Sequence, residues 1–269
     1  MSLVAVVGNL ARDRIDRGPP QPGGCPFFAA LALRMLGREG QILTRCADVD
    51  MPLFESTVAA LGVPVTVLPA AQTSGFDHAY DGETRWTTVT GIGDPWTPAD
   101  AGRLVADVSW VHVAPLLRSD FPAETLGALA AGRRLSLDGQ GLVRSPRLGP
   151  LVQDADFDPA ALEPVSVLKL SEEEARIVAG GTFDESTARA LGVPEILVTL
   201  GSHGEDVWVD GVLTHVPTTP VLEVETTGAG DAFMVGYAVA RTDGAEPVDA
   251  AAGASVLVVR MLDERRREE

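Results

Sequence analysis

The chain has 269 residues and a formal net charge of -17, because 38 acidic residues stand against 21 Lys and Arg. A charge of this sign and size repels phosphate backbones and anionic lipid surfaces, so nucleic acid and membrane are excluded as expected partners. With 45% hydrophobic and 22% charged residues, the composition is that of a folded protein, and we expect one large α/β domain over residues 1–269.

The two cysteines form no C-x-x-C motif, and no apolar run approaches the roughly 18 residues of a membrane span. These features predict a cytoplasmic protein.

The N-terminal third alternates between strand and helix patterns. Strands are predicted over 3–9, 41–47 and 63–69, and helices from Pro26 to Gly37 and over 52–61. The segment 73–91 differs, because apolar residues are sparse in it and Asp81-Gly82 is a hairpin signal. We therefore expect a polar hairpin there, outside the main sheet, that acts as a lid.

From residue 108 the alternation resumes. Strands are predicted over 108–115, 134–139, 165–171 and 195–201, helices over 121–132, from 172, over 229–241 and over about 246–265, and a hairpin over 205–217 with its turn at Asp210-Gly211. Such alternation predicts a doubly wound, mostly parallel central sheet with helices on both faces.

Polar residues follow several of the predicted strands, and ligands of such sheets bind beyond the carboxyl ends of the strands. The residues in question are Asn9, Asp13, Asp138, Gln140, Ser171 to Glu174 and Thr199 to Gly204. Their shared position predicts one binding site at one edge of the sheet.

The segment TTGAGD (226–231) comes directly before a predicted helix. Amide groups at a helix N-terminus bind anions, and Gly228, Ala229 and Gly230 would let a phosphate approach the backbone closely. Asp231 would be repelled by that phosphate, but it could accept the proton of a hydroxyl that attacks the phosphorus. The same Asp could also be an ordinary helix N-cap, and the pattern alone leaves both interpretations open.

Five segments together resemble the ribokinase-like carbohydrate kinases (the PfkB family). They are VVGNLARD (6–13), PGGCPFFAA (22–30), VLKLSEEEA (167–175), ILVTLGSHG (196–204) and VETTGAGDAF (224–233). The last resembles the family signature D-T-x-G-A-G-D-x-F, and the five occur in the family's order along nearly the whole chain. The resemblance implies a ribokinase-like fold with a small β lid, whose elements lie near 10–22 and 73–91.

The resemblance also implies a role for each matching residue. Asp231 would be the base, and the amides of Gly228, Ala229 and Gly230 would stabilise the transferring phosphoryl group. Asp13, Gly23, Gly24 and Phe28 would bind the acceptor, while Thr199, Gly201, Ser202, Gly204 and Thr227 would bind ATP. Glu174 would hold Mg²⁺ through water, and a monovalent cation would bind near Glu225.

Three positions depart from the family pattern. Phe28 and Ser171 replace Asn residues of the Gly-Gly loop and of N-x-x-E, and Glu225 replaces an Asp. Phe28 removes a polar contact to the acceptor. Together with Ser171 and the segment LDGQGLVR (137–144), it is similar to the cyclitol (inositol-type) branch of the family.

The segment LDGQGLVR has two interpretations. Asp138, Gln140 and Arg144 could line the acceptor site, with Arg144 paired to phosphate, or the loop could present Arg144 to solvent. Arg85 in the hairpin is similarly either a lid contact or an exposed cross-strand residue.

These features lead us to expect an ATP- and Mg²⁺-dependent kinase for a small polyol, a sugar or cyclitol, which could form a homodimer through its lid. Two alternatives remain open: a nucleoside kinase, in which Phe28 stacks on a base, and a family member that binds a ligand without turning it over.

Overall fold

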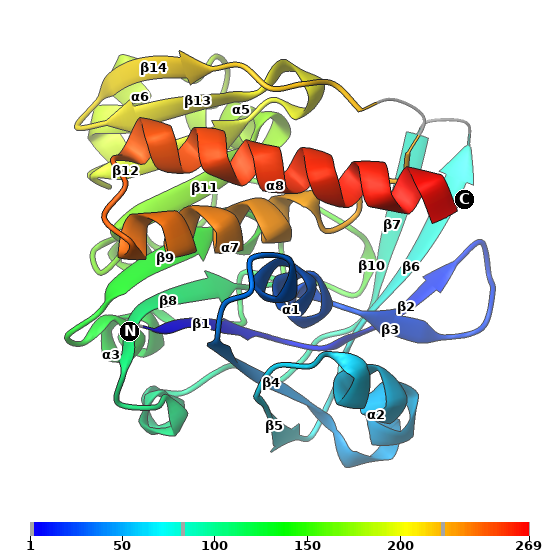
Figure 1. The fold of residues 1–269 in the computed structure, drawn as a ribbon. Coiled ribbons are helices and arrows are strands. Elements are labelled where there is room, and N and C mark those ends of the chain that lie inside the picture. Colours follow the sequence, from blue (N-terminus) through cyan, green and yellow to red (C-terminus); the bar gives the residue numbers. More distant parts are fainter. Residues whose placement is uncertain (1–2, 82–83, 222–223, 269) are drawn as a thin grey trace.

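The computed structural model describes residues 3–81, 84–221 and 224–268, and two β-sheets of different size organise it (Figure 1). The larger sheet has the order β14-β13-β12-β11-β9-β8-β1-β4-β5. Its strands are β1 (Leu3–Gly8), β4 (Gly40–Ala47), β5 (Val65–Ala70), β8 (Val108–Ala114), β9 (Arg134–Asp138), β11 (Val167–Ser171), β12 (Glu195–Thr199), β13 (Glu205–Val209) and β14 (Val212–Val216). All neighbours from β12 to β5 pair in parallel, whereas β13 and β14 add an antiparallel edge.

Helices cover both faces of this sheet. They are α1 (Cys25–Met35), α2 (Met51–Ala60), α3 (Ala123–Ala130), α4 (Gln140–Val143), α5 (Glu172–Ala179), α6 (Glu185–Leu191), α7 (Ala229–Thr242) and α8 (Pro247–Glu268). In Figure 1, α1, α7 and α8 lie in front of the sheet, and α3, α5 and α6 lie behind it. None of the helices in the described ranges is long and apolar enough to cross a membrane.

The two apolar cores follow from the alternation of side chains along each strand. Val4 and Val6 of β1 pack in the core formed with α1, α7 and α8, whereas Ala5 and Val7 pack in the core on the opposite face with α3 and α5. Because both faces are covered, the parallel strands carry apolar side chains on both faces, and buried polar residues such as Arg45 and Lys169 interrupt them. The predicted doubly wound parallel sheet is therefore confirmed.

The smaller sheet has the order β10-β7-β6-β2-β3. Its strands are β2 (Ala11–Ile15), β3 (Gln21–Gly23), β6 (Ser74–Asp81), β7 (Thr84–Gly91) and β10 (Gly149–Pro150). The predicted hairpin over 73–91 is present as β6 and β7, although Gly82 of its expected turn lies outside the described residues. Since β2 pairs with both β3 and β6, the segments near 10–22 and 73–91 belong to one sheet.

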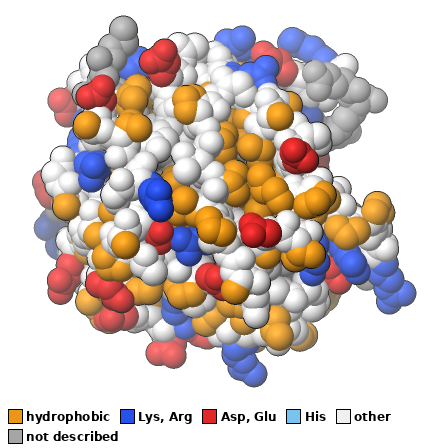
Figure 2. All heavy atoms as spheres, turned by 90° about the horizontal axis from the view of Figure 1, so that it is seen from below, with side chains coloured by type: hydrophobic (Ala, Val, Ile, Leu, Met, Phe, Trp, Pro, Cys, Tyr) orange, Lys and Arg blue, Asp and Glu red, His pale blue; other side chains and the backbone are white. Residues whose placement is uncertain are grey.

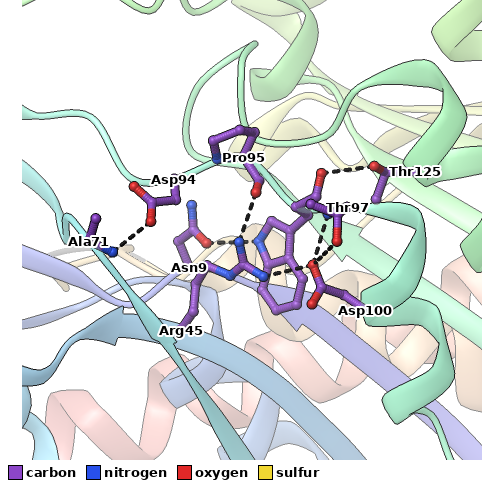
Figure 3. Close-up of polar contacts among 9 residues, drawn as sticks. Asn9, Arg45, Ala71, Asp94, Pro95, Thr97, Asp100 and Thr125 are labelled. Carbon is purple, nitrogen blue, oxygen red and sulfur yellow. Dashed lines mark hydrogen bonds and ion pairs between the residues drawn. The ribbon is translucent and has the colours of Figure 1, made fainter.

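A polar cluster anchors the segment that leads from β7 back to the large sheet (Figure 3). The indole Nε1 of Trp96 donates to Asn9 Oδ1 at 2.8 Å, and Thr125 Oγ1 donates to the Trp96 carbonyl at 2.8 Å. Arg45 of β4 lies over the Trp96 ring at 4.0 Å and donates to Asp100 Oδ2 at 2.8 Å. The small sheet is therefore joined to a rigid point beside the end of β1.

A second buried cluster fixes α7 against β12. Glu195, the first residue of β12, accepts hydrogen bonds at 2.6 Å from Arg134, from Tyr237 and from Arg241. Burial raises the pKa of Glu195, but the hydrogen bonds from Arg241 and Tyr237 and the charge of Arg134 outweigh it and hold that pKa below its usual range. The ion pairs orient the helix whose first turn contains Asp231.

We expect Glu195→Gln to lower the free energy of unfolding by about 3 kcal/mol, because the substitution leaves two guanidinium groups without their shared carboxylate. Urea unfolding measures the change. Arg176→Ala is the control, since its pair with Glu172 is more than half exposed and should contribute at most about 0.5 kcal/mol. A loss for Glu195→Gln no larger than the control's would show that the cluster does not hold α7.

Candidate active site

The first turn of α7 lies at the edge of the large sheet where β9 and β11 end. Gly228 precedes the helix with a φ of 81°, a left-handed conformation that glycine adopts without strain. The Ala229 amide donates to the Thr226 carbonyl at 3.0 Å and so closes the turn. Within the described ranges, the amides of Gly228 and Gly230 have no backbone acceptor, which leaves both available to an anion.

The ring of Phe28 lies directly against Gly228. A Cβ built at position 228 would collide with ring atoms of Phe28, which is half-buried on α1. The ring therefore packs on the turn of TTGAGD. Phe28 links the Gly-Gly loop to the start of α7, a contact that its place in the sequence did not suggest.

Lys169, which our sequence analysis did not single out, lies beneath this turn. Its Nζ donates to Asp138 Oδ2 at 3.1 Å, and both side chains are buried. The same Nζ lies 3.1 Å from where a Cβ of Gly230 would be. A lysine in the apolar strand VLKLS was the available signal, because a buried ammonium needs a partner.

The charges around Lys169 determine its protonation. Burial favours the neutral amine, but the carboxylates of Asp138, Glu174 and Asp231 outweigh it and raise the pKa of Lys169. Burial also raises the pKa of Asp138, and the charge of Lys169 more than offsets this, so the pKa of Asp138 is lowered. The pair is therefore ionic, with its positive end beside Gly230.

Asp231 has the pKa of a weak base. Burial, and to a smaller extent the negative charge of Asp138, raise the pKa of Asp231 to about 6, while Cys25, Lys169 and Arg144 partly offset the rise. The Cys25 thiol beside it has its own pKa raised well above the usual value by burial and by Asp231. Cys25 is therefore a neutral neighbour, and Asp231 is the group that can exchange a proton near neutral pH.

Asp13 follows β1 in the chain and lies on β2 of the small sheet. Its carboxylate rests against Gly23, Oδ1 is buried without a hydrogen-bond partner, and Oδ2 is 4.0 Å from His78 Nε2. Burial raises the pKa of Asp13 to about 6, although Arg85 and Arg144 lower it. A buried, unpartnered carboxylate oxygen is suited to accept a hydrogen bond from a ligand hydroxyl.

Gly24 joins β3 to α1 with a φ of 104°. A Cβ at this position would lie 2.5 Å from the carbonyl of Asn9, so only glycine fits there. The close approach brings the loop of Gly23 and Gly24 beside Asp13 and the end of β1. The side-chain oxygen of Asn9 accepts from Trp96, whereas its Nδ2 is buried without a partner among the described residues.

Arg144 follows α4 and is oriented inward rather than toward solvent. Its Nε is buried without a partner, and its charge acts on Asp231 and Asp13. Burial lowers the pKa of Arg144, against the opposing influence of Glu174 and Asp138. Gln140 contributes its backbone amide, which donates to Asp138 Oδ1 at 3.1 Å.

The residues expected to bind a nucleotide lie along the same edge of the sheet. Thr199 ends β12, and Gly201 and Ser202 form an exposed 3-10 turn that closes at Gly204. Thr227 is exposed, and its amide donates to Glu225 Oε1 at 2.9 Å.

Glu174 is buried in a capping box at the start of α5. Its Oε2 accepts from the Ser171 amide at 2.8 Å, and its own amide donates to Ser171 Oγ at 3.2 Å. Among the described residues no three His, Cys, Asp or Glu side chains cluster as a metal cage. The donor set nevertheless fits Mg²⁺, because this ion commonly uses one or two carboxylates together with phosphates and water.

The chain is similar to known kinases over most of its length. A model of the pfkB family carbohydrate kinases matches residues 70–258. A fructokinase of Klebsiella pneumoniae is 30% identical over 86% of this chain and 81% of its own. An inositol 3-kinase of Oryza sativa subsp. japonica is 28% identical over 91% of this chain and 64% of its own.

A solved pyrophosphate-dependent kinase of the ribokinase family, in complex with a pyrophosphate analogue and myo-inositol, has a similar fold. Its TM-score is 0.83 at 23% identity, with 97% of this chain and 95% of that one covered. The ribokinase-like fold implied by the sequence motifs is confirmed by this match.

The pKa of Asp231 predicts a pH dependence. A base must be ionised, so kcat/KM should fall about tenfold per pH unit as the pH drops below about 6. The pH profile of kcat/KM measures this. Asp13→Asn should keep the inflection and raise KM, which would assign the inflection to Asp231. A profile that stays flat down to pH 5 would contradict the raised pKa.

Gly230→Val should weaken donor binding and turnover by at least about tenfold, or about 1.4 kcal/mol, because its Cβ would crowd the Lys169 amine beside the anion site. Isothermal titration and steady-state kinetics measure the two effects. Gly253→Val on α8 is the matched control, since an added Cβ there meets no atom within 4 Å. Equal effects of the two substitutions would locate the anion site elsewhere.

Proposed function

Because the chain belongs to the pfkB family of carbohydrate kinases, we propose that it transfers the γ-phosphoryl group of ATP to a hydroxyl of a small sugar or cyclitol. One observation carries the proposal. A carboxylate with a pKa of about 6, Asp231, lies in the same helical turn as the unoccupied amides of Gly228 and Gly230. A base and an anion site at this spacing are suited to an attacking hydroxyl and its phosphoryl target.

In the proposed reaction Asp231 accepts the proton of the acceptor hydroxyl. The acceptor oxygen forms a bond to the γ-phosphorus, and the bond from that phosphorus to the bridging oxygen of ADP breaks. The amides of Gly228 and Gly230 and the ammonium of Lys169 stabilise the negative charge on the phosphoryl oxygens. Mg²⁺, when bound, would neutralise donor phosphate charge, with Glu174 holding it through water.

We propose that the small sheet is the lid over the acceptor. Three of its residues support this: Asp13 has an unpartnered buried oxygen, His78 lies beside it, and the charge of Arg85 acts on both. His78 Nδ1 lies 3.1 Å from Thr87 Oγ1, and burial lowers the pKa of His78 to about 4, so this imidazole is neutral. A neutral His beside a carboxylate can orient hydroxyl groups without adding charge.

The acceptor is a polyol ring, with a cyclitol as the first compound to test. Phe28 supports this choice over a nucleoside, because its ring packs against Gly228 and is therefore less free to stack on a base. The retained hydroxyl-binding carboxylate of Asp13 suits a ring that carries many hydroxyl groups. The names of the relatives, fructokinase and inositol 3-kinase, agree with this chemical class.

Inorganic pyrophosphate is a second candidate donor. Arg144 and Lys169 bring two cationic groups to the anion site, and the guanidinium of Arg144 has no ion-pair partner within the described residues. Two such charges suit a compact tetra-anion as well as a nucleotide. The fold match to a pyrophosphate-dependent kinase is the reason to test this donor directly.

Asp231→Asn should lower kcat by about 10²- to 10⁴-fold and leave donor affinity nearly unchanged, because it removes the base and keeps the size of the side chain. Stopped-time product assays and donor titration measure the two quantities. Wild-type turnover in this variant would end the assignment of Asp231 as base.

A panel of inositols, pentoses, hexoses and nucleosides, each with ATP or pyrophosphate, tests the substrate assignment. We expect the highest kcat/KM for a cyclitol. If the kcat/KM of a nucleoside or furanose exceeds that of the best cyclitol by more than about tenfold, or about 1.4 kcal/mol, the cyclitol assignment is wrong. The kinase assignment would still hold. A kcat/KM with pyrophosphate that exceeds the kcat/KM with ATP by the same factor would identify pyrophosphate as the donor.

A further inference from the structure

The backbone just before the anion site is held by an arginine from the other end of the chain. Arg265, in the last turns of α8, directs one nitrogen at three oxygens of residues 225–227. Its Nη1 donates to the Glu225 carbonyl at 2.5 Å, to Glu225 Oε2 at 3.2 Å and to the Thr227 carbonyl at 3.2 Å. The Arg265 side chain is only 21% exposed.

Two backbone carbonyls and a carboxylate that converge on one point are also what a monovalent cation selects, since carbonyl oxygens replace its hydration shell. The motif resemblance implies such a cation near Glu225. The oxygens fit a cation, but the nitrogen of Arg265 already lies among them. We propose that the guanidinium of Arg265 is the fixed cation of this turn, and that the protein therefore functions without potassium.

The orientation of the anion site follows from this contact. In a planar trans peptide the C=O and the N–H point in opposite directions. When Arg265 binds the Thr227 carbonyl, the amide of Gly228 in the same peptide unit must point away from α8. A cation at the carbonyl also polarises the peptide and makes that amide a stronger donor. Arg265 is thus a positioning residue that acts through the peptide between Thr227 and Gly228.

The side chain of Glu225 completes the arrangement. Its Oε1 accepts from the amide and the hydroxyl of Thr227, while its Oε2 accepts from Arg265. The turn is therefore closed on itself and tied to α8 by one charged group. Without that group, two carbonyls and a carboxylate would face one another with no positive charge between them.

The inference rests on the proposed function for its catalytic consequence, whereas its first test needs no activity. Thermal unfolding of the wild type should have the same midpoint in potassium chloride, sodium chloride and choline chloride at equal ionic strength. Arg265→Ala should unfold about 2–4 °C lower in choline chloride, and potassium should recover most of that loss by entering the vacated position. Arg267→Ala, an exposed arginine on the same helix, should show neither effect.

The second readout is kinetic. Arg265→Ala should lose on the order of tenfold in kcat/KM in choline chloride and regain most of it in potassium chloride. Arg265→Lys, which keeps a charged nitrogen, should remain independent of potassium. If no acceptor is phosphorylated at all, the proposed function fails, and the thermal result still tests the fixed cation.

Three results would overturn the proposal. The wild type could itself be stabilised or activated by potassium over choline. Arg265→Ala could match the wild type in every salt. Finally, Arg265→Ala could lose stability that potassium does not restore, which would make Arg265 a tether rather than a cation equivalent.

Discussion

The ammonium of Lys169 lies among three carboxylates, and the proposed active site depends on this one buried charge. Asp138 is its ion-pair partner at 3.1 Å, and Glu174 and Asp231 act on it electrostatically. Three carboxylates this close would each resist ionisation in a buried site. Lys169 allows Asp138 to stay ionised and limits the pKa of Asp231 to about 6, so that Asp231 is ionised at neutral pH.

The two sheets contribute different residues to the proposed site. The large sheet supplies the rigid part, because β9 and β11 carry Asp138 and Lys169, and α7 presents Asp231 and the amides of its first turn. Glu195 holds the later part of α7 through Tyr237 and Arg241, and Arg265 of α8 holds the backbone that leads into its first turn. The small sheet supplies Asp13 and His78, and it joins the large one through the anchored segment around Trp96.

Much of this arrangement could be predicted from the sequence, because it depends on local patterns. Apolar strand runs predicted the parallel sheet, and the segment TTGAGD predicted a helix start with available amides. The short strands β2 and β3 lack an apolar alternation, and the pairing of β2 with β6 is long-range, so only the family resemblance indicated a lid element near 10–22. The position of Asp13 on a strand of the small sheet is therefore known only from the structure.

The residues that the sequence did not identify act through contacts between distant segments. Lys169 was a single charge in an apolar strand, and only the neighbouring strand β9 shows that its partner is Asp138. Phe28 was expected against the acceptor, and its contact with Gly228, which comes from the packing of α1 on α7, was not expected. Arg265 belongs to the charged segment DERRREE, for which the sequence predicts a solvated helix end. In the structure α8 lies so that Arg265 contacts Glu225 and Thr227.

The most direct test of the whole account is a crystal structure with the best acceptor, the spent donor and a fluoroaluminate in place of the transferring phosphoryl group. Our account predicts one acceptor hydroxyl within about 2.6–3.2 Å of the Asp231 carboxylate. It also predicts fluorides that accept from the amides of Gly228 and Gly230. An acceptor whose hydroxyl groups all lie away from Asp231, or a fluoroaluminate bound by other groups, would contradict it.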